Sequence, residues 1–243
     1  MRLLLNKYSS LFFVLLCLSL ISCDKESDAL LVDELDEEYQ LYDYYIDKNG
    51  NEGIVAYILN GNSYPEGYRY MIVMSSDESL EPWGPMGEIV MKKDSASTSE
   101  FTRPTAGIIM LQSMYAKGID RYPAQQWCFE KNHSSEIGAS SWRLPSSYET
   151  RLILGKSGKN VANINRALAN TGGTMLDDSH LYWTCMEDYE NYITINGLTS
   201  DYDQANRAVL TSPHIETWGN KDRWLKKNHY YVRAIKYIYY YDY

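Results

Sequence analysis

Cysteine and histidine are the residue types best suited to nucleophilic or metal chemistry, and this sequence of 243 residues has four of each. The histidines stand singly, with no H-x-x-H or C-x-x-C spacing of a zinc site and no local signature of a Cys/His hydrolase around them. They are His133, His180, His214 and His229. We therefore predict no metal site, no cofactor and no enzymatic activity.

Cys23 follows a segment that is typical of an export signal. Arg2 and Lys7 precede the uncharged apolar run 11–20, which is shorter than the about 20 residues that a membrane-spanning helix needs. The letters L-I-S-C that end at Cys23 resemble the bacterial lipobox, in which the cysteine receives acyl chains and becomes the first residue of the mature protein. We predict a lipoprotein signal peptide at 1–22 and a membrane anchor on Cys23. An ordinary cleaved signal is the alternative.

The segment after Cys23 is strongly acidic. Residues 24–38 include eight acidic side chains and one lysine, and such a like-charged segment stays solvated and extended. We predict a lipidated acidic tether at 23–38 that holds a folded domain off the membrane. Acidic residues directly after the lipid-bearing cysteine also resemble an export signal of some outer-membrane lipoproteins, so we expect a surface-exposed position on the outer membrane. No basic stripe is visible and the pI is about 5.0, which argues against nucleic acid as a partner.

Cys128 and Cys185 are the two cysteines that remain after the signal peptide and the anchor are set aside. In an oxidising compartment such a pair favours one disulfide. It would close a long loop and stabilise the fold by roughly 4 kcal/mol on the loop-entropy model. Two buried free thiols are the alternative.

Patterns of strands and helices along 39–243 predict one α+β domain. Runs of tyrosine and aliphatic residues around an Asn-Gly turn predict strands at 39–47, 53–59 and 68–75. Helical spacing, Pro123 and the capping-box pair Ser146 and Glu149 predict helices at 105–117, 123–131, 147–154 and 160–169. Prolines and glycines predict a loop at 81–87. Short apolar runs predict strands at 181–186, 192–195, 208–211 and 230–240.

A series of short motifs follows in order along this domain. They are G-I-V-A-Y at 53–57, Trp83-Gly84, Ala124 with Cys128, Trp142-Arg143-Leu144-Pro145 with Glu149, Tyr182-Trp183-Thr184, and Val232-Arg233-Ala234-Ile235. In this order they resemble a bacterial domain family of unknown function, which looks like the C-terminal domain of collagen-like adhesins and the surface domains of fibre-degrading bacteria. The resemblance covers about 42–238 and implies a C-type-lectin-like fold.

The motif residues are expected to be structural. Trp142 and Leu144 are predicted core anchors, and Pro145 fixes the approach of the chain to the capped helix. Trp183 is expected in the centre of the domain, as buried aromatic side chains usually are.

Two arginines in the motifs predict ion pairs. Arg143 is expected to pair with a carboxylate. Arg233 stands in an otherwise apolar strand, so we predict a buried or half-buried ion pair that holds the terminal strand in register.

Two activities that occur on related folds lack their residues here. Formylglycine-generating enzymes use two nearby cysteines close to the C-terminus, whereas no cysteine follows Cys185. Sugar-binding C-type lectins hold calcium with a Glu-Pro-Asn or Gln-Pro-Asp loop and a Trp-Asn-Asp strand. Here Glu81-Pro82 is followed by Trp83, and glycine and lysine interrupt the run 218–222. We expect neither activity.

Aromatic and basic residues between 187 and 228 are the ligand-binding candidates, because the long loop region of C-type-lectin-like domains corresponds to this stretch. They are Tyr189, Tyr202, Trp218, Lys221, Arg223 and Trp224. Aromatic side chains cover much area at low entropic cost and are common at recognition sites. A core position for Trp224 is equally compatible with the sequence. The basic cluster 221–227 indicates either an acidic glycan site or a solvated face.

We predict a non-catalytic cell-surface lipoprotein that binds an extracellular protein or glycan, in adhesion or in the assembly of surface fibres. A carbohydrate-binding accessory protein or enzyme of an envelope polysaccharide system is the alternative. A structural envelope lipoprotein without a soluble ligand is a third possibility.

Overall fold

The computed structural model describes residues 39–59, 68–90, 105–133, 137–187, 207–211 and 223–241, all within one compact unit. The predicted signal peptide, the tether and Cys23 lie outside these residues. So do the predicted strand 192–195 and the ligand candidates Tyr189, Tyr202, Trp218 and Lys221. In the part of the chain that is described, no helix is long and apolar enough to cross a membrane.

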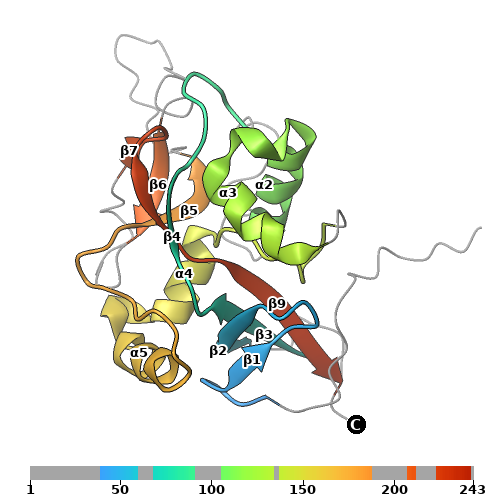
Figure 1. Ribbon diagram of the computed structural model, residues 1–243, viewed down its shortest axis with the longest axis vertical. Coiled ribbons are helices and arrows are strands. Elements are labelled where there is room, and N and C mark those ends of the chain that lie inside the picture. Colours follow the sequence, from blue (N-terminus) through green and yellow to red (C-terminus); the bar gives the residue numbers. More distant parts are fainter. Residues whose placement is uncertain are drawn as a thin grey trace, which may run out of the picture. The chain divides into compact units, whose positions relative to one another are not determined.

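The N-terminal strands and the last strand form one antiparallel sheet (Figure 1). Its order is β1-β2-β3-β9, with β1 at Tyr44–Ile46, β2 at Glu52–Leu59, β3 at Tyr68–Ser75 and β9 at Ile235–Tyr241. The predicted hairpin and third strand are confirmed. β1 is shorter than predicted because the backbone of Tyr42 has a φ of 76°, which an extended strand does not allow.

The four predicted helices are confirmed, with ends within two residues of those expected. They are α2 at Thr105–Ala116, α3 at Pro123–Phe129, α4 at Ser147–Leu154 and α5 at Val161–Asn170. Single 3-10 turns occur at η2 (Ile119–Arg121), η3 (Glu130–Asn132) and η4 (Lys156–Gly158). The predicted capping box is present, since the Glu149 N–H donates to Ser146 Oγ and the Ser146 N–H donates to Glu149. α4 and α5 pack on β2, and α2 packs on β5.

A second sheet has the order β4-β8-β5-β6-β7 (Figure 1). Its strands are β4 at Ser79–Pro82, β5 at Tyr182–Glu187, β6 at Arg207–Thr211, β7 at Arg223–Leu225 and β8 at His229–Val232. β5 and β8 are parallel at one residue pair, and the other neighbours are antiparallel. β4 and β7 were not predicted, because S-L-E-P and R-W-L are too short to show a strand period. The α+β class is confirmed by these two sheets and the helices.

The predicted terminal strand 230–240 is wrong as a single strand. β8 and β9 belong to different sheets, and Arg233-Ala234 connects them. The chain changes sheets there because the Arg233 side chain donates to the carbonyls of Ser75 and Ser76, at the end of β3. The Ala234 N–H also donates to Ser75 Oγ, at 3.2 Å.

The predicted core tryptophans are confirmed. Trp142 is 1% exposed and Trp183 is fully buried, as is Leu144. Each buried indole N–H has an acceptor, as the cost of burying a polar group demands. Trp142 donates to Asp47 Oδ2 at 2.8 Å, Trp183 donates to the Glu81 carbonyl at 2.9 Å, and Trp83 donates to the Thr184 carbonyl at 2.8 Å.

The predicted disulfide between Cys128 and Cys185 is wrong. Both are free, fully buried thiols in the same apolar cluster, one on α3 and the other on β5. Burial raises the pKa of each thiol well above its usual value and keeps it protonated. The two cysteines therefore act as small apolar core residues, which was the alternative.

Candidate ligand-binding surface

The segment from β7 to β8 carries the ligand candidate whose side chain the structure describes. The two strands are not paired with each other, because β7 pairs with β6 and β8 pairs with β4 and β5. A tight turn joins the strands, in which the Asn228 N–H donates to the Leu225 carbonyl at 2.9 Å. Trp224 on β7 is 42% exposed, so it is not a core residue. Arg223 also belongs to β7, but its side chain lies outside the described residues. The surface can therefore be built from Trp224 and the residues that support it.

An aromatic series runs from the exposed Trp224 into the core. The Trp224 ring lies 5.8 Å from that of Tyr230, with the planes inclined at 54°. Tyr230 meets the buried Trp183 edge to face, at 5.2 Å and 87°. Such contacts stabilise aromatic pairs beyond their buried area. The exposed indole thus rests on rings that are themselves fixed, which favours contact with a ligand at little loss of side-chain freedom.

Lys226, in the turn between β7 and β8, forms a fully buried ion pair with Glu187. The Lys226 Nζ lies 2.5 Å from Glu187 Oε1, and neither side chain is exposed to solvent. Nζ also donates to the Glu88 carbonyl at 2.7 Å, and Glu187 accepts from the Val90 N–H at 2.9 Å. Burial lowers the pKa of Lys226, although the Glu187 charge opposes this effect. Lys226 is therefore not part of a basic surface, in contrast to the neighbouring Lys227, which is exposed.

The main chain of Lys226 anchors the turn a second time. Its carbonyl accepts from the Trp83 N–H at 2.8 Å and the Gly84 N–H at 3.3 Å. Its Nζ lies 4.6 Å from the centre of the Trp83 ring, within the range of a cation–π contact. A Cβ at Gly84 would come within 2.7 Å of Tyr122, which explains why glycine follows this tryptophan. The Trp83-Gly84 motif thus binds the main chain of the turn between β7 and β8.

Arg143 and Glu149 form a second fully buried ion pair, as predicted. Nη1 and Nη2 of Arg143 bind the two carboxylate oxygens at 2.9 and 2.5 Å. Burial lowers the pKa of Arg143, but the Glu149 charge and the hydrogen bonds to Glu149, with smaller contributions from other neighbours, together outweigh burial and raise the pKa. Because Glu149 also completes the cap of α4, the pair attaches the W-R-L-P segment to this helix. It is sealed from solvent and offers nothing to a ligand.

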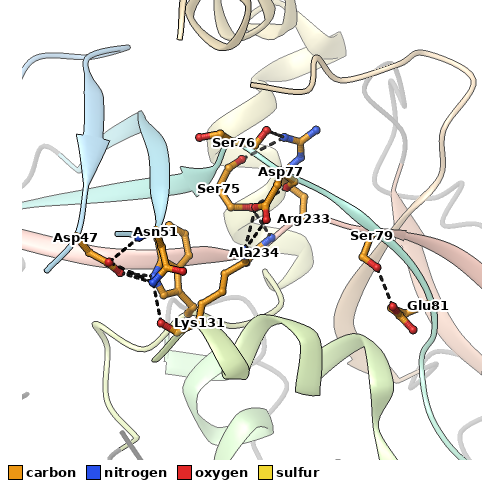
Figure 2. A network of polar contacts seen from close by, with 11 residues as sticks. Asp47, Asn51, Ser75, Ser76, Asp77, Ser79, Glu81, Lys131, Arg233 and Ala234 are labelled. Carbon is orange, nitrogen blue, oxygen red and sulfur yellow. Dashed lines mark hydrogen bonds and ion pairs between the residues drawn. The ribbon is translucent and has the colours of Figure 1, made fainter. Parts of the chain in front are cut away.

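Arg233 forms the predicted buried ion pair with Glu78, at 2.6 Å. Figure 2 shows its side chain reaching the carbonyls of Ser75 and Ser76, both at 3.1 Å. Glu78 also accepts from the Tyr182 hydroxyl at 3.0 Å. Arg233 therefore holds the crossing between the two sheets, rather than the register within one strand.

Asp47 is a structural site that the sequence analysis missed. It accepts from Trp142 Nε1 at 2.8 Å and from Asn51, whose Nδ2 also donates to the Lys131 carbonyl at 2.7 Å (Figure 2). Burial tends to raise the pKa of Asp47, but these hydrogen bonds and the Lys236 charge outweigh it and lower the pKa. Its position at the end of a predicted strand carried no signal of a partner 95 residues away.

Two other features bear on small-ligand and metal binding. A small apolar hollow of about 30 Å³, partly open to solvent, is lined by α4 and β5 residues together with Leu176 and Ile235. Its lining is almost wholly apolar, so it lacks the few placed polar groups that orient a small ligand. Within the described ranges, no group of three histidine, cysteine or acidic residues is placed to hold a metal ion.

Comparison with solved structures gives a similarity that informs the fold. No family model matches the chain, and no curated protein matches it. The crystal structure of a fimbrial protein from Bacteroides ovatus is similar, with a TM-score of 0.56 and 15% sequence identity. The match covers 84% of this chain and 50% of that one. The two proteins share a fold, and this chain spans about half the length of the fimbrial protein.

Proposed function

We propose that the protein is a non-catalytic lipoprotein of the cell surface that binds a protein or glycan through the end of the domain where Trp224 is exposed. Adhesion or the assembly of surface fibres is the role that we infer. The observation that carries the proposal is the exposed Trp224 ring, which is backed by Tyr230 and Trp183 and followed by a turn with a buried anchor. A large aromatic side chain that is both exposed and fixed is typical of a binding hot spot.

We also propose that the domain has a C-type-lectin-like fold. The ordered motifs favour it, and so does the pairing of β9 with β3, which brings the C-terminal strand into the sheet of the N-terminal strands. The likeness to a fimbrial protein supports a role connected with surface fibres. The calcium-binding motifs of sugar-binding C-type lectins are absent from the sequence, so binding is expected to persist in a chelator.

A binding screen tests the proposed function. We expect the purified mature chain, in detergent, to bind saturably to a glycan array or to immobilised extracellular proteins. Trp224→Ala should weaken this binding at least about tenfold, because it removes the exposed ring. Tyr115→Ala is the matched control, since Tyr115 is a similarly exposed aromatic residue (39%) on α2.

The outcomes separate the candidate functions. Binding confined to envelope polysaccharides would support the carbohydrate-binding accessory role. No saturable ligand in either format would favour a purely structural lipoprotein and contradict the proposal. Trp218→Ala extends the test to the candidate residues outside the described part of the chain.

The membrane anchor is tested at Cys23. Cells that express the chain and are labelled with a clickable palmitate analogue should incorporate the label, and Cys23→Ala should abolish incorporation. Protease added to intact cells should then degrade the anchored domain if it is surface-exposed. Label retained in Cys23→Ala would contradict the proposed anchor.

A further inference from the structure

We propose that Lys226 and Glu187 are positioning residues whose buried ion pair holds the Trp224 ring in a single orientation. They act through the turn that joins β7 to β8 and do not contact the ligand. The inference rests on the proposed function in one respect, namely that Trp224 is the residue that meets the ligand.

The β7 strand is too weakly held by its sheet to fix a side chain. It has three residues and lies at the edge of the second sheet, with β6 as its one neighbour in the strand order. Edge strands of this length are marginal without further packing. Something besides the sheet must therefore hold Trp224 in place.

The register of the sheet connects Glu187 to Trp224. Glu187 on β5 lies opposite Ala208 on β6, and Ala208 lies opposite Trp224 on β7. Lys226 follows Trp224 by two residues, and its Nζ donates to the Glu187 carboxylate. The ion pair therefore ties the edge of the sheet back to β5, two strands away.

The acceptors of Lys226 come from separate parts of the chain. Its Nζ binds the Glu187 carboxylate and the Glu88 carbonyl, while Glu187 accepts from Val90. The pair thus joins the turn between β7 and β8, the end of β5 and the segment after β4. A charged group whose acceptors are fixed in two separate segments has one satisfactory position, whereas an apolar side chain could pack in several.

Energetics favour a role in position over a role in stability. Burying two charges removes their hydration, and apolar replacement of both partners is often neutral or stabilising. Loss of one partner alone leaves a buried charge without its counter-ion and is strongly destabilising. The double replacement therefore separates the two roles, because it should preserve stability while it removes the fixed geometry.

The test uses the mature chain labelled with 5-fluorotryptophan. The chain has six tryptophans, and each should give a separate fluorine resonance. Trp224→Phe assigns the resonance of Trp224. In Lys226→Met/Glu187→Leu we expect an unchanged melting temperature but a Trp224 resonance that is shifted, or at least about twofold broader. Lys227→Met is the matched control, because Lys227 is the exposed neighbour, and it should leave the resonance unchanged.

A wild-type Trp224 shift and line width in the double variant would overturn the proposal. If that variant does not fold, Glu187→Gln carries the test through the same resonance, since it keeps the shape and removes the charge. The two hypotheses fail in different ways. If the Trp224 resonance is perturbed in the double variant but the binding screen finds no ligand for the wild type, the proposed function alone is refuted. A wild-type resonance together with binding that Trp224→Ala abolishes would refute the positioning role alone.

Discussion

Two fully buried ion pairs differ in what they hold in place. Arg143 and Glu149 lie six residues apart and join a loop to the helix that directly follows it. Lys226 and Glu187 lie 39 residues apart and join the turn after the short edge strand β7 to the end of another strand. The first pair is part of a helix cap in the core, whereas the second lies beneath an exposed tryptophan. The difference indicates that equal burial can serve folding in one region and the geometry of a surface in another.

The largest expected effect is the loss of one partner in the core pair. Arg143→Met leaves Glu149 buried without a counter-ion and should lower the free energy of unfolding by about 3–5 kcal/mol. Chemical denaturation measures the change. A decrease in the free energy of unfolding below about 1 kcal/mol would mean that Glu149 finds other partners. It would contradict the structural role of the Arg143–Glu149 pair.

Gly107→Ala tests the packing around the Arg143–Glu149 pair, because the direction of its effect on stability should be the opposite of the usual one. Alanine in place of glycine inside a helix is normally stabilising. Here a Cβ at Gly107 would collide with the Arg143 guanidinium, so Gly107→Ala should destabilise the protein by about 1–3 kcal/mol. A stabilised variant in thermal melts would show that the helix and the ion pair are not in close contact.

Replacement of both partners should separate the two pairs. Arg143→Met/Glu149→Leu removes the capping box as well, so it should remain destabilised by about 1–2 kcal/mol. Lys226→Met/Glu187→Leu carries no cap and should stay within about 1 kcal/mol of the wild type. Denaturant midpoints of the two variants test this order, and the reverse order would break the comparison.

A smaller effect on stability is expected at Asp47, in a third region. The main partners of this buried carboxylate are neutral donors rather than a counter-ion. Its pKa is lower in the folded state than in the unfolded chain, so its stabilising contribution is present above about pH 4 and is lost as the pH falls through the folded-state pKa. Asp47→Asn should therefore reduce the acid-dependent loss of stability. Urea denaturation at pH 6 and pH 3 measures this, and equal pH dependence in both proteins would contradict it.

Sequence patterns predicted the local features well. The S-x-x-E cap, the helices and the pairing of Arg143 with a nearby carboxylate depend on residues within one or two turns of each other. Such contacts are expressed in spacing and residue type. The buried positions of Trp142 and Trp183 followed from their aromatic side chains, which are usually buried.

Contacts between distant segments were beyond these patterns. Lys226 stands among other basic residues, and nothing in that run distinguishes the one lysine that meets Glu187 in the core. The break between β8 and β9 depends on carbonyls of Ser75 and Ser76, more than 150 residues earlier. The expected disulfide rested on the number of cysteines and the compartment, neither of which reports the direction of two buried side chains.

The most direct test of the central claim is a fluorine NMR titration of the 5-fluorotryptophan-labelled chain with the ligand that the binding screen identifies. We predict that the Trp224 resonance shifts saturably, with the same midpoint as binding, while the resonances of the buried Trp83, Trp142 and Trp183 stay in place. A Trp224 resonance that does not move at ligand saturation would contradict the claim that this ring is the point of contact.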